Sequence, residues 1–426
     1  MPDDRAHVGF GGAPSRRPGR IGGYSPKLAP LESASLYIHI PFCTRKCGYC
    51  DFYSVEMGHT MHTDLMWRVC AASLQHLEWF LRATGGPRID TVFVGGGTPT
   101  LLGPRAAKEY LCTVAEMIGN SPVEWTIEGN PESLTEELIE VYQEAGVTRL
   151  SIGVQSLDPK HLQILDRLTN PEGNIKILEL LGRTWRGLLN VDLICGIPGQ
   201  TTEEILSDIR TVISYDPGHV SLYTLVVEEG TPLATRIASG EVGEPDEDAI
   251  ADGWLAGVEK LESLGYKQYE ISNFAKEGLH SRHNMVYWHL DPYIGVGPAA
   301  VSTIPGERGA LRATAPRDLS FYLRGEQGRW GVEWEEISPG NLLFEHLMMG
   351  LRLSDGVDLA TIERRFGIDL TKLSRDTLAE WQSSDLLEIS PHSIKLTTKG
   401  RPFLNRFLEE MVESLTHVGI PAVTWP

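Results

Sequence analysis

The hydrophobic and polar residues of this chain alternate between two periods from Leu36 onward. Short apolar runs typical of strands lie at residues 36–41, 91–97, 123–130, 149–156, 189–198 and 219–225. Longer amphipathic runs typical of helices lie between them, at residues 62–82, 104–118, 135–145, 173–184 and 202–214. Strands that alternate with helices predict βαβ units and an α/β fold with a parallel sheet, either open or curled into a barrel.

The two faces of these strands differ in character, and this difference favours a barrel. Successive side chains of a strand point to opposite faces, so Tyr37, Glu128, Ser151 and Asp192 lie opposite their apolar neighbours. A doubly wound sheet is covered by helices on both faces, and its strands are almost continuously hydrophobic. A complete or partial barrel with a polar lumen fits better. Because a buried carboxylate needs a partner, Glu128 and Asp192 are expected to meet a ligand or a cation, with ordinary core hydrogen bonds as the alternative.

The two ends of the chain differ from this central region, which we assign to residues 35–330 as a barrel domain with a C-terminal extension. Residues 1–34 are rich in Gly, Pro and Arg and predict a flexible tail. Residues 331–426 predict three helices, two short strands and a last helix, the order typical of a winged-helix-like domain. Acidic side chains outnumber basic ones from Glu335 onward. We therefore expect this domain to cover the barrel or bind a partner rather than DNA.

The amino-acid composition limits the classes of binding partner and the cellular compartment that we expect. The net charge is −19, and a chain this acidic lacks the phosphate attraction on which nucleic-acid binding depends. Six cysteines in 426 residues are too few for a disulfide framework and indicate a reducing compartment. No apolar run reaches the roughly 18 residues of a membrane span, and the N-terminus lacks the apolar core of a signal peptide. We expect a cytoplasmic protein with no nucleic-acid partner and at most peripheral membrane contact.

Three of the cysteines, Cys43, Cys47 and Cys50, lie close together directly after the first predicted strand, in the stretch CTRKCGYCDF. A structural zinc site needs four ligands, usually from two CxxC pairs, and the sequence has no second pair. A four-iron cluster bound by three thiolates leaves one iron open to a ligand from outside the protein. Radical S-adenosylmethionine (SAM) chemistry uses such an open iron, so this spacing predicts a [4Fe–4S] cluster that binds SAM.

The residues around the three cysteines support this interpretation. Gly48 would let the chain wrap closely around a bulky cluster, and the aromatic side chains of Tyr49 and Phe52 would shield it. The remaining cysteines are scattered in apolar settings and are predicted to be core residues: Cys70, Cys112 and Cys195.

A glycine-rich stretch, GGGTPT at residues 95–100, follows the second predicted strand. It lacks the Lys and Ser/Thr ending of a phosphate-binding loop. Its backbone N–H and C=O groups could instead bind the amino and carboxylate ends of SAM. The alternative is a tight turn between a strand and a helix.

Five stretches together, LYIHIPFCTRKCGYCDF, GGGTPT, IEGNP, GVQS and DLICGIPGQ, resemble the radical SAM family of oxygen-independent coproporphyrinogen III oxidase-like proteins over about residues 35–415. The resemblance implies a partial (β/α)6 TIM-like barrel, a [4Fe–4S] cluster on the three cysteines, SAM at the strand ends and an electron donor for the cluster. The SAM contacts that it implies are Tyr37, Gly96, Gly97, Thr98, Glu128, Gln155, Arg167 and Asp192. Arg167 has the weakest case, because an arginine on a helix is most often solvated.

One departure from the family pattern separates its branches. The dehydrogenases resemble CxxxCxxCxC, whereas Phe52 stands at the last position here, which is similar to the HemW-type heme chaperones. The stretch HNxxYW at residues 283–288 resembles the same branch. The resemblance implies heme binding and transfer to an unidentified acceptor protein, with His283 as the candidate iron ligand and Tyr287 or Trp288 stacked on the porphyrin. Oxidative decarboxylation of coproporphyrinogen III is the alternative activity, and an unrelated SAM-dependent enzyme is a third hypothesis.

Overall fold

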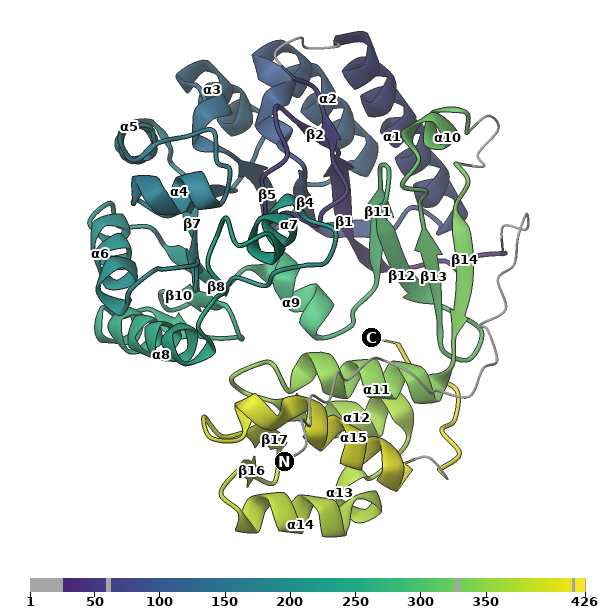
Figure 1. Ribbon diagram of the computed structural model, residues 1–426. Helices are drawn as coiled ribbons and strands as arrows, with labels where there is room; N and C mark the ends of the chain where they lie inside the picture. Colours follow the sequence, from purple (N-terminus) through teal and green to yellow (C-terminus); the bar gives the residue numbers. More distant parts are fainter. Residues whose placement is uncertain (1–25, 59–62, 326–329, 416–417, 426) are drawn as a thin grey trace.

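Six parallel strands form the centre of the computed structural model (Figure 1), which describes residues 26–58, 63–325, 330–415 and 418–425. In order across the sheet they are β1 (Ser33–Ile40), β4 (Arg88–Gly96), β5 (Glu124–Gly129), β6 (Arg149–Gln155), β7 (Leu188–Cys195) and β8 (His219–Thr224). Each overlaps one of the six strands expected from the apolar runs. The strands and their crossover helices form the predicted partial (β/α)6 barrel of the radical SAM type.

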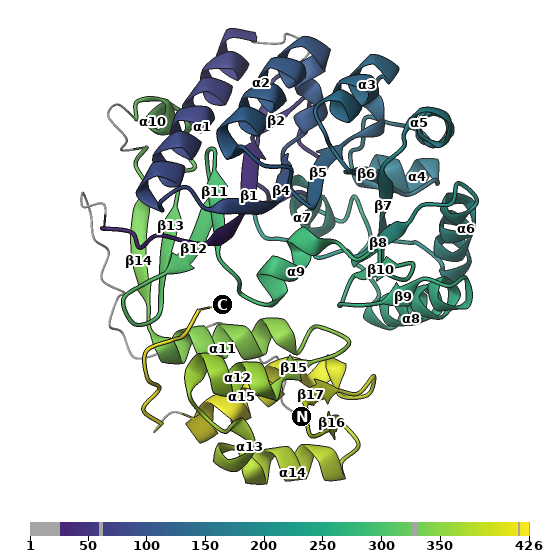
Figure 2. The same cartoon turned by 180° about the vertical axis from the view of Figure 1, so that it is seen from behind.

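Helices cover the outer face of this curved sheet (Figures 1 and 2). They are α1 (Thr63–Ala83), α2 (Gly103–Ile118), α3 (Glu136–Glu144), α4 (Pro159–Ile164), α5 (Pro171–Thr184), α6 (Thr202–Ile213) and α8 (Glu247–Ser263). The short helix α7 (Pro232–Ala238) lies instead beside residues 43–50, where the amide of Leu233 donates to the carbonyl of Gly48. Local chemistry defines their starts, as in α6, where Thr201 and Glu204 form a reciprocal capping box. The apolar strand faces, for example Leu36, Ile38 and Ile40, are fully buried in the core shared with these helices. The opposite faces carry the polar side chains into the lumen.

Antiparallel strands extend the sheet at both edges. β11 (Tyr293–Val296) pairs with β1, and β12 (Val301–Pro305), β13 (Ala310–Thr314) and β14 (Glu333–Ile337) follow it. At the other edge, β10 (Asn273–Ala275) and β9 (Lys267–Gln268) follow β8. β14 belongs to this sheet, and Trp334 packs in the barrel core. The boundary predicted at residue 330 therefore lies too early, because the sheet continues to Ile337.

The predicted tail also ends earlier than expected. Residues 1–25 lie outside the described residues, but Leu28 is buried in the barrel core. The amide of Leu31 donates to the carbonyl of Thr84 after α1, and β1 begins at Ser33. Residues 28–34 are thus part of the barrel domain, since their apolar side chains and backbone groups have partners there.

A separate C-terminal domain packs beneath the barrel (Figures 1 and 2). It contains α11 (Pro339–Gly350), β15 (Val357–Asp358), α12 (Leu359–Phe366), α13 (Leu370–Leu373), α14 (Arg375–Ser383), β16 (Leu387–Ile389), β17 (Ser393–Leu396) and α15 (Leu404–Leu415). Its sheet has three strands in the order β15-β17-β16, one more than the sequence indicated. The domain has its own core around Phe366, Trp381 and Phe407. Within the described residues, no helix combines the length and apolar content that a bilayer crossing requires.

Short elements complete the part of the chain that positions the site. β2 (Phe42–Cys43) pairs with β3 (Val55–Glu56) and brackets the cysteine loop. The short helices η1 (Pro99–Leu102) and η2 (Pro131–Ser133) follow β4 and β5. Two further helices, α9 (Arg282–Trp288) and α10 (Leu319–Leu323), belong to the barrel side, and α9 lies beside α11 of the C-terminal domain (Figure 1).

Candidate cluster and cofactor site

The cysteine loop, residues 43–50, sits at the carboxyl end of β1 and is bound to the segment after α4. The amide of Gly48 donates to the carbonyl of Leu165, and its own carbonyl accepts from the amide of Leu233. A Cβ atom at Gly48 would lie 2.4 Å from a carboxylate oxygen of Asp166. A side chain at this position would require the Asp166 carboxylate to move, so glycine favours the close approach of the loop to this segment. This matches the expectation that Gly48 lets the chain wrap tightly.

The glycine-rich stretch holds the cysteine loop from the other side. The amide of Gly97 donates to the carbonyl of Ile40, and the amide of Thr98 donates to that of Phe42. The amide of Gly96 donates to Oε2 of Glu128. A Cβ atom at Gly97 would lie 2.6 Å from the Phe42 carbonyl oxygen. The amides of Gly97 and Thr98 hold the end of β1 in place, and that of Gly96 bonds Glu128, so the glycines act at least in part through close packing rather than as free donors for SAM.

A chain of hydrogen bonds connects two of the thiols. Thr98 Oγ1 lies 3.6 Å from Cys43 Sγ and accepts from Asn130 Nδ2 at 3.0 Å. Arg167 donates to Asn130 Oδ1 at 3.0 Å and to Cys47 Sγ at 3.4 Å. Hydrogen bonds to sulfur stabilise the thiolate form that an iron cluster requires. The segments that follow β4, β5 and α4 thus converge on the cysteine loop.

Arg167 differs from its expected setting. It lies beyond the end of α4 rather than on a helix, and its side chain is buried instead of solvated. It also donates to the carbonyl of Gly153 at 2.7 Å, while its Nε has no partner. A buried cation with an open donor needs an anionic or polar partner. This supports the implied role of Arg167 beside the cluster and SAM.

Burial governs the protonation of the thiols. The pKa of Cys43 is raised by burial, and burial raises the pKa of Cys50 to about 11. Both thiols are therefore protonated at neutral pH until iron displaces the proton. No three His, Cys, Asp or Glu side chains of the described residues are gathered tightly enough for a single metal ion. A four-iron cluster fits better, because it places each thiolate on a different iron atom, further from the others.

Aromatic shielding of the cysteines comes from one predicted residue and not from the other. Tyr49 is half-buried among apolar side chains, and burial raises the pKa of its hydroxyl. Phe52, in contrast, is 70% exposed. The expectation that Phe52 covers the cluster is wrong, because its side chain points to solvent from the loop that leads to β3.

Tyr37 and His39 form a hydrogen-bonded pair in the lumen. The carbonyl of Tyr53 can only accept, so His39 Nε2 carries the proton and donates to it at 2.9 Å. His39 Nδ1 then accepts from the Tyr37 hydroxyl at 2.9 Å. Burial lowers the pKa of His39 to about 4, which keeps the ring neutral. His39 is a positioning group for Tyr37 and Tyr53 and lies, as expected, along the lumen.

Two half-buried carboxyl groups, those of Glu128 and Asp192, lie in the lumen. Burial, and next the nearby Asp192, raise the pKa of Glu128 to about 7. Burial also raises the pKa of Asp192, whose carboxyl accepts from Ser151 and Asn190. Hydrogen bonds to neutral donors leave this pair of acids without a full counter-charge. The pair is therefore suited to a cationic ligand, and SAM carries both an ammonium and a sulfonium group.

Gln155 ends β6 in an unusual conformation. Its φ is +66°, and the pairing of β6 with β7 shifts register between Gly153 and Gln155. The amide oxygen of Gln155 is buried without a hydrogen-bond partner. A strained backbone and an orphaned acceptor together indicate a ligand-binding position. Both observations agree with the predicted SAM contact.

His283 is fully buried at the start of α9. Its Nδ1 is 2.7 Å from Thr91 Oγ1, and its Nε2 is 2.9 Å from the Tyr287 hydroxyl. Both ring nitrogens are engaged and the ring stacks on Phe93. That His283 binds heme iron stays a prediction; in this structure Thr91 and Tyr287 are the partners of its two ring nitrogens.

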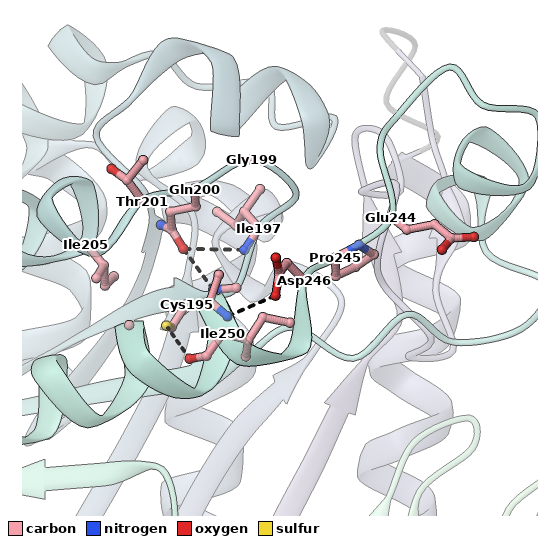
Figure 3. Close-up of a pocket in the computed structure, with 13 residues that line it drawn as sticks. Cys195, Ile197, Gly199, Gln200, Thr201, Ile205, Glu244, Pro245, Asp246 and Ile250 are labelled. Carbon is pink, nitrogen blue, oxygen red and sulfur yellow. Dashed lines mark hydrogen bonds between the residues drawn. The ribbon is translucent and has the colours of Figure 1, made fainter.

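The other three cysteines stand apart from the candidate cluster site. Cys70 and Cys195 are buried as predicted, whereas Cys112 is exposed on α2, so its assignment to the core is wrong. Cys195 lines a small pocket at the end of β7, where its thiol contacts the carbonyl of Ile250 and Gln200 accepts from two backbone amides (Figure 3).

Asn130 was missed by the sequence reasoning. It lies in the quoted stretch IEGNP, two residues after Glu128, but only the folded structure connects it to both Thr98 and Arg167. The signal available in the sequence was its place at the carboxyl end of a strand with a polar face. The site therefore includes seven side chains that surround the cysteines and the lumen: Tyr37, Thr98, Glu128, Asn130, Gln155, Arg167 and Asp192.

Comparisons with known proteins agree with this geometry. The Radical SAM superfamily profile matches residues 37–212, and the HemN C-terminal domain profile matches residues 337–403. The solved structure of coproporphyrinogen III oxidase (HemN) from Escherichia coli superposes with a TM-score of 0.75 over 90% of each chain, at 21% identity. At 21% identity, this structural similarity establishes the fold and not the activity. A partial barrel with a three-cysteine loop after its first strand defines the class of radical SAM proteins.

Relatives of higher identity define the branch. The heme chaperone HemW of Escherichia coli is 34% identical over 387 residues, which cover 90% of this chain and 98% of the relative. HemW of Haemophilus influenzae is 32% identical, and the match again covers 90% of this chain and 98% of the relative. The mitochondrial radical S-adenosyl methionine domain-containing protein 1 of Bos taurus is 33% identical. That match covers 95% of this chain and 93% of the relative. The chain belongs to the HemW-type branch of the radical SAM family.

Proposed function

We propose that this protein binds heme and transfers it to an acceptor protein, on a scaffold that also holds a [4Fe–4S] cluster and SAM. The observation that carries the proposal is the match to relatives named heme chaperones along nearly their whole length. Phe52 supports the same assignment, because it stands where the dehydrogenase pattern has a further cysteine.

In this proposal Cys43, Cys47 and Cys50 hold three irons of the cluster, and the fourth iron is open to SAM. Once reduced by an electron donor, such a cluster would pass one electron to bound SAM, and one carbon–sulfur bond of SAM would break. The chain's own contribution is placement. The glycine-rich stretch holds the cysteine loop against β1, and Arg167 fixes Cys47 through a hydrogen bond.

The lumen residues have defined roles toward SAM. Glu128 and Asp192 offer negative charge to its cationic groups, and Gln155 offers a free acceptor. Arg167 Nε offers a free donor to its carboxylate. Tyr37 and His39 close the polar lumen, and burial keeps both neutral, since it raises the pKa of the tyrosine and lowers that of the histidine. These groups bind and orient SAM while the barrel walls exclude water.

The remaining partners follow from the same scaffold. Cluster reduction needs an electron donor, and the transferred heme needs an acceptor protein. We further propose a cytoplasmic location without nucleic-acid partners, supported by the few cysteines and the net charge of −19. Membrane contact, if made, would be peripheral.

Two measurements on anaerobically reconstituted protein test the proposal. Heme titration should shift the Soret band to that of a protein-bound heme. Incubation with SAM, a reductant and coproporphyrinogen III should leave the substrate unchanged. Formation of protoporphyrinogen IX would instead support the dehydrogenase, and the absence of any Soret shift would reject the heme chaperone.

A further inference from the structure

A buried chain of hydrogen bonds runs from the lumen carboxyl group of Asp192 to the interface with the C-terminal domain. Its intermediate members are Asn190 on β7, His219 at the start of β8 and Tyr269, which lies between β9 and β10. The side chains of these three residues are buried, with at most 7% of each residue exposed. None of the three belongs to the seven side chains of the candidate cofactor site. The chain therefore adds an outer layer of contacts behind Asp192.

The C-terminal domain holds the outer end of this chain. The amide of Ser354, which follows α11, donates to the carbonyl of Tyr269 at 3.0 Å. The neighbouring residues Glu270 and Leu353 form an isolated antiparallel β-bridge at the same place. On the barrel side, the Tyr269 ring stacks on His280 with 4.3 Å between the ring centroids. Tyr269 is thus fixed by contacts from both domains.

The hydrogen bonds of this chain all run in one direction. Asn190 Oδ1 can only accept, so His219 Nδ1 carries the proton and donates to it at 2.5 Å. Burial lowers the pKa of His219 well below its ordinary value, so the ring is neutral and Nε2 has no proton. The Tyr269 hydroxyl therefore donates to Nε2 at 2.8 Å, and its oxygen accepts from the amide of Ser281 at 3.3 Å. Because one ring nitrogen faces a donor and the other an acceptor, these contacts select the tautomer of His219.

The inner end of the chain fixes the carboxyl group of Asp192. Because its oxygen accepts from His219, the Asn190 amide directs Nδ2 toward Asp192 and donates to Oδ1 at 2.8 Å. Nδ2 also donates to Ser151 Oγ at 2.7 Å, and Ser151 Oγ donates to Asp192 Oδ2 at 3.1 Å. If the Asn190 amide turned over, its oxygen would face the Asp192 carboxylate and repel it. The orientation of this amide, and with it the position of the carboxyl group, therefore depends on His219.

We propose that Tyr269 and His219 are positioning residues for SAM binding, which act through Asn190 on the carboxyl group of Asp192. The inference rests on the role proposed above for Asp192 as a partner of the cationic SAM. Tyr269 selects the tautomer of His219, and His219 selects the orientation of the Asn190 amide. A carboxyl group held in this way has a fixed direction, so little conformational freedom is lost when SAM binds. Since the C-terminal domain holds Tyr269, that domain contributes to a site inside the barrel.

Equilibrium binding of SAM to the full-length, anaerobically reconstituted protein tests the inference. Tyr269→Phe removes only the hydroxyl group and keeps the aromatic ring, and it should weaken SAM binding about threefold to tenfold. His219→Ala should weaken SAM binding at least as much. His219→Asn should restore part of the affinity, because its side-chain amide can still donate to Asn190.

Tyr110→Phe is the matched control for the loss of a hydroxyl group. The Tyr110 hydroxyl is also buried, but it bonds Ser73 between α2 and α1, outside the chain that leads to Asp192. This variant should change the dissociation constant of SAM by less than about twofold. Cluster absorbance and far-UV circular dichroism should stay unchanged in Tyr269→Phe and in the control.

A double-mutant cycle separates positioning of Asp192 from a general structural effect. In an Asp192→Ala background, Tyr269→Phe should change SAM affinity by less than about twofold, because the group on which Tyr269 acts is already gone. A loss that persists in full in this background would overturn the inference. Unaltered SAM affinity in both Tyr269→Phe and His219→Ala would also overturn it and leave the proposed function intact. Absence of SAM binding in the unmodified protein would overturn both the inference and the SAM part of the proposed function.

Discussion

Arg167 donates a hydrogen bond to the sulfur of Cys47 over 3.4 Å, although the two residues are 120 positions apart in the chain. The same guanidinium donates to Asn130 and to the carbonyl of Gly153. Three segments of the barrel thereby meet at one thiol. The cysteine loop has little regular structure of its own, so this contact is a main determinant of where Cys47 lies.

The electrostatics of this contact predict a change in reduction potential. In Arg167→Ala the reconstituted cluster should have a more negative potential, because the thiolate loses a hydrogen bond and a neighbouring positive charge. Arg167→Lys should give a smaller shift, since it keeps the charge but lacks the planar fork. Redox titration followed by electron paramagnetic resonance measures this. Arg210→Ala, which removes a half-exposed arginine of α6, is the control, and an equal shift there would contradict the assignment.

The cysteine assignment predicts a clear division among the thiols. Replacing any one of Cys43, Cys47 or Cys50 by Ala should abolish the visible absorbance of the iron–sulfur cluster, because each thiolate would hold a different iron atom. Cys195→Ala should keep it, since that thiol packs against Ile250 at the end of β7 (Figure 3). Iron and sulfide analysis with absorption spectroscopy separates the two groups. Equal loss of cluster in the Cys195 variant would count against the ligand set.

The raised pKa of Glu128 predicts a pH dependence of SAM binding. The carboxyl group titrates near pH 7 instead of its ordinary 4.5, so it is mostly neutral below pH 7 and negative above it. Affinity for the cationic SAM should therefore rise from pH 6 to pH 8. Glu128→Gln should remove most of this rise, as followed by equilibrium binding at each pH. A dissociation constant for SAM that is flat with pH in the unmodified protein would reject the lumen role.

The same group has an opposite effect on the stability of the ligand-free protein. Because the folded pKa is raised, the unfolded chain binds fewer protons between pH 4.5 and 7, and Glu128 reduces the unfolding free energy as pH rises through that window. Glu128→Gln should flatten this part of the stability profile.

The buried ion pair between Glu124 and Arg149 predicts a large effect on stability. Its N–O distance is 3.1 Å, and the side chains are 7% and 4% exposed, respectively. Glu124 also accepts from the backbone of Arg282 and His283 and so anchors the start of α9. Glu124→Ala should lower the unfolding free energy by about 3–5 kcal/mol, because Arg149 is left buried without its counter-charge.

A surface pair serves as the control for this prediction. Asp90 pairs with Arg88 at 2.6 Å, but the Arg88 side chain is 61% exposed and that of Asp90 36%. Asp90→Ala should cost no more than about 1 kcal/mol in chemical denaturation, since solvent screens the pair. If Glu124→Ala and Asp90→Ala lowered the unfolding free energy by similar amounts, burial would not be what makes the Glu124–Arg149 ion pair strong.

Much of the barrel was predictable because its signals are local. The alternation of Leu36, Ile38 and Ile40 with Tyr37 and His39 follows from the two-residue period of a strand, and the structure keeps these faces. The helices begin at capping residues that can be read directly, such as Thr201. The spacing of the three cysteines and the positions of Glu128 and Asp192 on polar strand faces are likewise local patterns.

Other features depended on contacts between distant residues. Arg167 was expected to be solvated, and only its burial between Cys47, Asn130 and Gly153 shows otherwise. Phe52 was expected to shield the cluster, but the path of the loop turns it outward. β14 joins the barrel sheet by pairing with β13, which no local pattern in residues 333–337 indicates.

The sequence by itself determined the class of fold and the polar strand faces of the lumen, and it predicted the cysteine ligand set, because strand period, capping chemistry and ligand spacing act over a few residues. Only the tertiary structure decided which histidine ring nitrogens have hydrogen-bond partners. Both ring nitrogens of His283 have hydrogen-bond partners, Thr91 and Tyr287, while Nδ1 of His346 is buried without one. The physical reason is that the hydrogen-bond partners of a buried imidazole come from whichever elements pack around it; Thr91, for example, lies 192 positions from His283 in the chain.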